Sequence, residues 1–402
     1  MFKTAVNKLR YSNWCQTLGC HSQVYIVGGS VRDAIMHPDI KPKDVDLLVV
    51  GLSIPQIIEV LKPFGRIDAV GASFQVIKFV PTGETEVVDI AVPRKDFKIG
   101  DGHKGFELVT ENVTFEEDMY RRDFTMNSIA YSLATDEFID LFGGIDDIKS
   151  RTLRAVNVNA FTEDPLRILR GIGFASRFKL RIDDQTSTLM KMNAASLHQI
   201  SSERVITEIE KIIAFNKFKA DMSNYVNVLQ QHSCLEPLFG GCPVTHNVGH
   251  LFCEIRNVSD FLYGMLLTMP DLNSTKFLKT MKISTEVRKG VVDLISLNEL
   301  SNSRNEAELR YALFTFQLKP WNTPLTAFLP LNMLHIVELM RCDRIPTSLF
   351  SAFSGDDLLA MGIKEGVEVG RALKNVYKSA LMEEFDWKSA TKDDFFKYIA
   401  YE

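Results

Sequence analysis

The fold of this chain is decided by VYIVGGSVRD at residues 24–33, which is followed eleven residues later by DVDLLVV at residues 44–50. The β-branched run VYIV predicts a strand that ends at Gly28–Gly29, and Ser30 then begins a predicted helix with Arg32 in its first turn. Glycines lack a Cβ atom and therefore allow a tight turn and a close approach of phosphate oxygens. The N-terminus of a helix also favours an anion. This stretch therefore predicts a strand, a turn and a helix that bind a phosphate group.

Carboxylates follow at the start of the next predicted strand. Asp44 and Asp46 are two residues apart, so both point to one face of the strand and can address one site. A divalent cation offsets the repulsion between them, and Mg²⁺ binds one or two carboxylates together with substrate phosphates. Asp89, on a later predicted strand, is a candidate third carboxylate. The combination predicts phosphoryl transfer by two metal ions, although each feature alone also occurs in ordinary turns and solvated strand ends.

Periodic segments divide the chain into a small head and a longer helical part. The head contains predicted strands over 24–27, 46–50, 74–80 and 85–92, helices over 30–36 and 54–64, and a turn at 81–83. A polar stretch over 93–114 is expected to be a long loop, followed by a helix that carries 121–131. Apolar residues then recur every three or four positions, which predicts helices over 164–178, 184–195 and 201–215 and a helical remainder. The expected fold class is α+β.

Composition favours a soluble globular protein. The chain has 402 residues, more than one domain usually contains, of which 46% are hydrophobic and 24% charged. No apolar run reaches the roughly 18 residues that a membrane span needs, and the amino terminus lacks the apolar core of a signal peptide. Six sparse cysteines favour reduced thiols. We therefore expect a cytoplasmic protein with no membrane partner.

One cluster of cysteines and histidines leaves a metal site open. Cys242, His246, His250 and Cys253 lie within twelve residues of one another. Their spacing is not that of a common zinc finger, and neighbouring glycines and a proline indicate a turn. Both interpretations stay open, with the turn favoured.

Charge is distributed unevenly along the chain. The net charge is −5, but it comprises −7 over residues 1–148, +6 over 149–219 and −4 over 220–402. A carboxylate-rich head followed by a basic helical segment suits an enzyme that holds metal ions beside a polyanion. Charged, solvated helix faces would give the same totals, so charge alone does not decide.

Several motifs together resemble those of a known family. GGSVRD followed by DVD resembles the signature of the bacterial-type tRNA nucleotidyltransferase and poly(A) polymerase family, a branch of the polymerase-beta-like nucleotidyltransferases. Five further segments resemble family motifs in the same order, namely RRDFTMNSIA (121–130), DLFGG (140–144), EDPLRILR (163–170), SERVITEIEK (202–211) and SGDDLLAMGIKEGVEVGRAL (354–373). The resemblance covers about 220 residues nearly continuously and recurs near the end.

The resemblance implies a domain plan and a set of site residues. The plan is a catalytic nucleotidyltransferase head with a mixed sheet over 1–145, a helical neck with the base template over 146–220, a helical body over 221–350 and a helical tail that contacts tRNA over 351–402. Asp44, Asp46 and Asp89 would be catalytic, with Asp44 and Asp46 as Mg²⁺ ligands of a two-metal site. The residues expected to bind the nucleotide are Gly28, Gly29, Ser30, Arg32, Lys43, Arg94, Arg121, Arg122, Asp123, Asn127, Asp164, Arg167 and Arg170.

Asp164 and Arg167 would form the base template in this family. Their i, i+3 spacing puts them on one helix face, where an acceptor and a donor fork suit the edge of cytosine or adenine. A second interpretation is that Asp164, which precedes Pro165, only caps the helix. Base recognition is favoured because the other motifs are in register, with Glu163 or Thr162 then left to cap the helix.

The resemblance implies an enzyme that adds CCA to the 3′ end of tRNA from CTP and ATP. Residues 94–106 resemble the flexible loop of full CCA-adding members, and the final residues lack the basic extension usual in poly(A) polymerases. Poly(A) synthesis and A-only or CC-only addition are the alternatives. Other hypotheses are a non-catalytic RNA-binding module and an unrelated nucleotidyltransferase that shares only the head. The oligomeric state and the role of 221–350 are not predicted.

Overall fold

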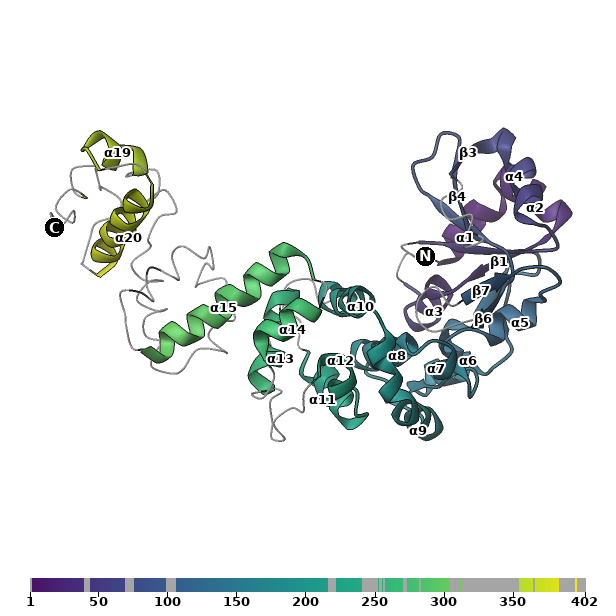
Figure 1. The fold of residues 1–402 in the computed structure, drawn as a ribbon. Coiled ribbons are helices and arrows are strands. Elements are labelled where there is room, and N and C mark those ends of the chain that lie inside the picture. Colours follow the sequence, from purple (N-terminus) through teal and green to yellow (C-terminus); the bar gives the residue numbers. More distant parts are fainter. Residues whose placement is uncertain are drawn as a thin grey trace. The chain divides into compact units, whose positions relative to one another are not determined.

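The computed structural model describes residues 2–39, 44–68, 76–98, 106–215, 222–240, 252, 255, 257–269, 273–281, 283–303, 308, 311, 354–363, 366–382 and 395 (Figure 1). The chain divides into two compact units. One comprises Met1–Ile212 and Asn224–Cys242, and the other comprises Ile213–Ser223 and Pro243–Glu402. The finer division at residues 145, 220 and 350 stays a prediction.

A seven-stranded sheet forms the head of the first unit. Its strands lie in the order β3-β4-β5-β2-β1-β8-β9. Their bounds are β1 Gln23–Val27, β2 Asp46–Val50, β3 Gly65–Asp68, β4 Val76–Pro81, β5 Val88–Ala91, β8 Ile129–Ser132 and β9 Glu137–Asp140. Strands β2 and β5 run parallel, whereas the other neighbouring pairs are antiparallel. The predicted mixed sheet and α+β class are therefore confirmed.

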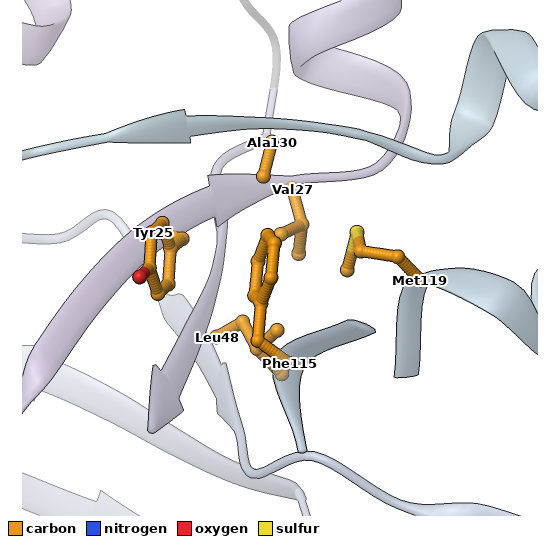
Figure 2. Close-up of a cluster of buried hydrophobic side chains, with 6 residues drawn as sticks. All are labelled: Tyr25, Val27, Leu48, Phe115, Met119 and Ala130. Atoms are coloured by element: carbon orange, nitrogen blue, oxygen red, sulfur yellow. The ribbon is translucent and has the colours of Figure 1, made fainter. Parts of the chain in front are cut away.

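Helices flank this sheet, and one of them is fastened to its centre by an apolar cluster. The helices of the head are α1 Phe2–Arg10, α2 Asn13–His21, α3 Gly29–Met36, α4 Ile54–Leu61, α5 Phe115–Tyr120 and α6 Gly144–Lys149. Figure 2 shows Phe115 and Met119 of α5 against the central strands, which contribute Tyr25, Val27, Leu48 and Ala130. The rings of Tyr25 and Phe115 lie 4.6 Å apart. Since burial of such side chains drives folding, this cluster fixes α5 and the residues that follow it.

Two expectations for the head are wrong. Residues 121–131 do not form one helix, because α5 ends at Tyr120, a short 3₁₀ turn spans Thr125–Asn127, and β8 begins at Ile129. Residues 93–114 are not simply a loop, because β6 Lys95–Lys98 and β7 Phe106–Val109 pair as an antiparallel hairpin. At 121–131 a short apolar run was assigned to a helix, since periodicity alone does not separate a short strand from a helix, whereas at 93–114 the polar composition hid two short strands that form by pairing with each other.

Helices follow the head, as expected. The first unit continues with α7 Ala160–Glu163, α8 Leu166–Phe178, α9 Asp184–Asn193, α10 Ser202–Phe215, α11 Ser223–Gln231 and α12 Leu235–Phe239, of which α10 and α11 run across the unit boundary. The described helices of the second unit are α13 Val258–Thr268, α14 Ser274–Thr280, α15 Thr285–Ser303, α19 Gly355–Ala360 and α20 Val367–Met382. Among all these described elements, every helix is too short or too polar to traverse a bilayer. The three described cysteines, Cys15, Cys20 and Cys234, are free thiols, as predicted.

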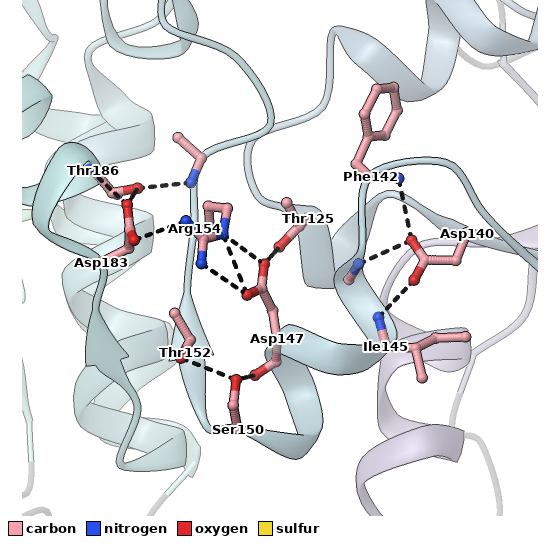
Figure 3. A network of polar contacts seen from close by, with 12 residues as sticks. Thr125, Asp140, Phe142, Ile145, Asp147, Ser150, Thr152, Arg154, Asp183 and Thr186 are labelled. Carbon is pink, nitrogen blue, oxygen red and sulfur yellow. Dashed lines mark hydrogen bonds and ion pairs between the residues drawn. The ribbon is translucent and has the colours of Figure 1, made fainter.

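A polar network joins the end of the sheet to the helices that follow it (Figure 3). Asp147 of α6 accepts from the Thr125 hydroxyl at 2.7 Å and from the Arg154 guanidinium at 3.1 Å, and Arg154 also donates to Asp183 at 2.7 Å. Close packing accompanies the network, because a Cβ atom on Gly144 would lie 2.2 Å from the Thr125 carbonyl oxygen. The segment DLFGG therefore ends in a rigid contact rather than an open turn.

The start of α6 is capped by a single carboxylate. Asp140 accepts hydrogen bonds from the backbone N–H groups of Phe142 at 3.3 Å, Gly144 at 2.9 Å and Ile145 at 2.8 Å (Figure 3). The N–H groups at the start of a helix have no acceptor within the helix. The Asp140 carboxylate supplies the missing acceptor.

We predict that Asp140→Ala destabilises the head by roughly 1–2 kcal/mol, because three N–H groups lose their acceptor. Amide hydrogen exchange over residues 142–149 should become faster. Asp146→Ala is the matched control, since the Asp146 side chain is 87% exposed and pairs with Lys149 at 3.2 Å. Equal exchange rates in the two variants would contradict the capping role.

Candidate active site

A cavity of about 620 Å³ opens within the first unit. The C-terminal end of β1 and the strands β2 and β5 form one wall, while α8 and Arg204 of α10 form another. Its charged lining residues are seven arginines and four aspartates, namely Arg32, Arg94, Arg121, Arg122, Arg167, Arg170, Arg204, Asp46, Asp89, Asp123 and Asp164. The excess of cations suits a ligand with several negative charges. Most of the predicted site residues are therefore brought together in one place.

The glycine turn lies at the floor of this cavity. Gly28 has φ +79°, and a Cβ atom at this position would approach the Asp46 Oδ2 atom to 3.4 Å. Both properties favour glycine, and both leave the backbone open to a ligand. Ser30 does not line the cavity, because its side chain is buried and its hydroxyl donates to the Val27 carbonyl at 3.4 Å.

Asp46 and Asp89 are direct neighbours in the parallel pairing of β2 with β5. Asp46 is exposed at the start of β2, yet partial removal of its carboxyl from water raises the pKa, and the charges of Asp89 and Asp44 raise it further, against the opposing effect of Arg122. Lys78 of β4 lies 3.4 Å from Asp89 Oδ1, and that oxygen is buried without a hydrogen bond. Negative charge is thus concentrated at Asp46 and Asp89, and the positive charges of Lys78 and Arg122 offset it only in part. Asp44 is exposed just before β2 and is not part of the cavity lining.

These carboxylates fit a divalent cation by their chemistry. Carboxylate oxygens are the ligands that Mg²⁺ prefers, and Asp89 Oδ1, which lies 3.4 Å from Lys78 but accepts no hydrogen bond, is the kind of atom that a cation would satisfy. Within the described part of the chain, however, no three His, Cys, Asp or Glu side chains are already arranged as a metal site. Two carboxylates therefore face each other, and a third ligand is not preassembled.

A buried carboxylate that the sequence analysis missed organises the arginines. Asp118 of α5 is fully buried and accepts from Arg121 at 2.6 Å and from Arg122 at 3.0 Å. Burial opposes its charge, but Arg122 and Arg121 outweigh this effect and lower the pKa of Asp118. The acidic first turn of the helix was a possible signal, but only the fold shows which acid is buried.

A second network connects α3 to α8. Arg32 donates to the Asn127 side-chain oxygen at 2.9 Å, and the Asn127 amide donates to Asp123 Oδ1 at 3.0 Å. Arg170 of α8 donates to Asp123 Oδ2 through Nε at 2.9 Å and Nη2 at 2.7 Å. Burial disfavours the charge of Asp123, yet Arg170 and these hydrogen bonds lower the pKa of its carboxyl. All four predicted nucleotide-binding residues of this network are thus engaged with one another.

The contacts of Asp164 are compatible with both interpretations of this residue, helix capping and base recognition. Its Oδ1 atom accepts from the Leu166 backbone N–H at 3.1 Å, which is a capping contact at the start of α8. Its Oδ2 atom lies 3.0 Å from an Arg204 nitrogen, and both residues line the cavity. Neither alternative cap is used, because Thr162 donates to Asn193 and Glu163 accepts from Arg167.

Arg167 lies beside Asp164 but is already hydrogen bonded. Its guanidinium donates to Glu163 at 2.9 Å and to the Arg121 carbonyl at 2.7 Å. The remaining prediction, Lys43, lies outside the described residues, as do Cys242, His246, His250 and Cys253. Arg204 was missed because its partner Asp164 is 40 residues away in the sequence.

Comparisons with known proteins identify the family to which this chain is similar. The family model described as "Poly A polymerase head domain" matches residues 24–154, and the model described as "Probable RNA and SrmB- binding site of polymerase A" matches residues 179–243. The "Multifunctional CCA protein" of Acinetobacter baylyi is 31% identical over 341 residues, which cover 81% of this chain and 71% of that protein.

Two further comparisons set the extent of the similarity. The "Multifunctional CCA protein" of Haemophilus ducreyi is 36% identical over 242 residues, which cover 59% of this chain and 53% of that protein. The chain spans about half the length of several such curated relatives. Its fold is similar to the solved structure titled "The structure of CCA-adding enzyme apo form II", with a TM-score of 0.75, 22% identity and coverage of 98% of this chain and 95% of the other.

We predict that Asp46→Asn stabilises the metal-free protein at neutral pH while abolishing any metal-dependent activity. Removing one of two facing charges should raise the free energy of unfolding by a few tenths to about 1 kcal/mol, the Coulomb energy of two charges 4 Å apart in water. Thermal unfolding in a chelator measures this. Added Mg²⁺ should then raise the melting temperature of the wild type more than that of the variant.

Asp68→Asn is the control for this prediction, because Asp68 is an acid of the edge strand β3 that pairs with Arg66 at 3.2 Å. It should leave stability nearly unchanged with or without Mg²⁺. A lower melting temperature of Asp46→Asn in chelator would show that the two carboxylates do not repel each other.

We further predict a pH-dependent loss of stability in Asp123→Asn. The folded-state pKa of Asp123 is lowered, so its stabilising contribution is present above about pH 4 and is lost as the pH falls below that value. The variant should lose roughly 2–3 kcal/mol at pH 7, less than for a wholly buried pair because 35% of the Arg170 side chain is exposed. Urea unfolding at pH 7 and pH 3 should show the difference from wild type shrinking in acid. A constant difference would contradict the ionic role.

Proposed function

The chain belongs to the tRNA nucleotidyltransferase and poly(A) polymerase family, and from this premise we propose that it adds CCA to the 3′ end of tRNA from CTP and ATP. One observation carries the proposal. A single cavity contains the Asp46–Asp89 carboxylate pair beside Gly28–Gly29 and, on its other wall, Asp164 with Arg204. A site for phosphoryl transfer and a site that reads the edge of a base thus share one space.

The carboxylate pair of Asp46 and Asp89 is proposed to hold Mg²⁺ in a two-metal site. Asp46 and Asp89 would be the ligands inside the cavity, and Asp44 would join them from its exposed position. Mg²⁺ held there would supply Lewis acidity, which would favour loss of the proton from the RNA 3′ hydroxyl to water and offset charge on the departing pyrophosphate. In the reaction, the 3′ oxygen bonds to the α-phosphorus, and the bond from that phosphorus to the bridging oxygen of pyrophosphate breaks.

The chain's own residues bind and orient the triphosphate. The open backbone at Gly28–Gly29 begins α3, where N–H groups and the helix dipole favour phosphate oxygens. Arg122 is near this turn, since its Nη1 atom would be 4.0 Å from a Cβ on Gly28. Its charge also acts on Asp46, so Arg122 can neutralise phosphate charge close to the carboxylate pair.

Asp164 is proposed to read the base. An ionised carboxylate accepts hydrogen bonds, and cytosine and adenine both present an exocyclic amino group. Uracil and guanine present a carbonyl at the equivalent place, which would face Asp164 as acceptor against acceptor. Arg204 holds the carboxylate from the side and thereby limits its rotation.

The RNA is proposed to lie on the basic part of the chain. Residues 149–219 carry the net charge of +6, and residues 354–373 resemble the tRNA-contacting tail of the family. Contacts with phosphates would make affinity fall with salt. A minihelix of the acceptor and T arms should then suffice as substrate. The proposed setting is the cytoplasm, which suits the free thiols of the described cysteines.

One experiment tests the activity. The protein is incubated with tRNA that ends at the discriminator base and with each labelled nucleoside triphosphate, and the 3′ ends are sequenced. Ordered addition of C, C and A supports the proposal. Poly(A) tails, A alone or CC alone would identify the alternative activities, and no addition in the wild type would reject the enzyme.

We predict that Asp164→Ala admits UTP and GTP and also slows the use of CTP and ATP. A good pair of this kind contributes roughly 1–3 kcal/mol of discrimination. Because Asp164 also accepts from the Leu166 N–H, about 1 kcal/mol of stability should be lost. The measurements are the four-nucleotide incorporation profile and the melting temperature.

Asp183→Ala is the matched control for this variant. Asp183 caps α9 by accepting from the Thr186 N–H, and it does not line the cavity. Its loss should lower stability with no change in nucleotide choice. If Asp164→Ala behaves in the same way, Asp164 only caps a helix.

A further inference from the structure

Asp118 receives four hydrogen bonds, as many as its carboxylate has lone-pair sites, and three of them come from arginine side chains. Its Oδ1 atom accepts from Arg121 Nε at 2.9 Å, Arg121 Nη2 at 2.6 Å and the Arg94 backbone N–H at 3.2 Å. Its Oδ2 atom accepts from Arg122 Nη2 at 3.0 Å. Its side chain has no exposed surface, so it cannot contact a substrate itself.

The partners of Asp118 face the cavity, unlike Asp118. Arg94, Arg121 and Arg122 all line it, and the Arg121 and Arg122 side chains are 20% and 16% exposed. Arg122 is near both Gly28 and Asp46, where the phosphates are proposed to bind. A long arginine side chain loses conformational entropy when it binds a ligand. A carboxylate that already fixes the guanidinium group before the ligand arrives reduces this entropy cost of binding.

We propose that Asp118 is a positioning residue, which holds Arg121 and Arg122 in the orientation that binds the triphosphate of the incoming nucleotide. The inference rests on the proposed function. It assigns Asp118 to affinity for the phosphates and not to choice of base, because none of its contacts reaches Asp164. Its loss should therefore weaken all nucleotides equally.

The adjacent acid provides a matched control. Glu117 of the same helix lies 2.5 Å from Lys95 through Oε1 and accepts from the Thr114 N–H at 3.0 Å through Oε2. Its pairs are with a lysine and a backbone group, outside the arginine pair that Asp118 holds. Glu117→Gln should therefore change stability without changing nucleotide affinity.

The experiment compares Asp118→Asn with Glu117→Gln in the full chain. For Asp118→Asn we expect the KM for CTP and for ATP to rise tenfold or more, with a smaller change in kcat per active site and an unchanged incorporation profile. Inhibition by inorganic pyrophosphate should weaken by a similar factor. A purely structural role would lower the amount of active protein and leave KM and the inhibition constant unchanged, which would overturn the proposal.

Three further measurements keep the test decisive. If Asp118→Asn does not fold, Asp118→Glu retains the charge but displaces both guanidinium groups, and its KM must still rise for the proposal to stand. The double variant Asp118→Asn with Arg122→Lys should show less than the product of the two single effects on KM, because both act through Arg122. Independent effects would overturn the assignment. Calorimetry of CTP binding to the wild type without RNA tests the proposed function separately from the role of Asp118. If the wild type does not bind CTP, the proposed function itself is refuted.

Discussion

The parallel pairing of β2 with β5 is the constraint on which the rest of the site depends. It is the one parallel pair in a sheet whose other neighbours are antiparallel, and it sets Asp46 directly opposite Asp89. Two like charges at one register position are unfavourable in the absence of a cation. The surrounding elements limit this repulsion, with Lys78 on the neighbouring strand and Arg122 above the glycine turn. For the stability of the sheet alone, a neutral residue in place of either acid would be more favourable.

Paired arginines and aspartates then distribute the remaining charge. Asp118 holds two arginines from behind, Asp123 fixes Arg170, and Arg204 restrains Asp164. The Asp118 pairs are local, three and four residues along the chain at the end of α5, whereas Asp123–Arg170 and Asp164–Arg204 join residues 47 and 40 positions apart and connect the wall to α8 and α10. Removing one partner of a buried pair leaves the other charge uncompensated, so loss of Asp118 or Asp123 should be strongly destabilising.

Local signals were enough to predict the centre of the site, but not its surroundings. The strands at 24–27 and 46–50 and the glycine turn were correctly predicted, since each has its signal within a few residues. The strand β8 was mistaken for a helix because four residues, IAYS, have no period of their own and are a strand only by pairing with β1 and β9. Asp118 and Arg204 were missed for a related reason, because burial and a partner far along the chain are properties of the fold. The roles of the site residues stay predictions.

The contacts of Glu117 affect how freely the length of one segment of the head can change. One of its carboxylate oxygens is bound to Lys95 and the other to the Thr114 N–H, so a single side chain fastens both ends of the segment between them. The backbone pairing of β6 with β7 closes the same segment a second time. Doubling the length of a closed loop costs only about 0.6 kcal/mol in chain entropy. Because Glu117 and the β6–β7 pairing hold the ends of this segment together, a change in its length would cost little chain entropy, and the positions of Lys95 and Thr114 need not change with it.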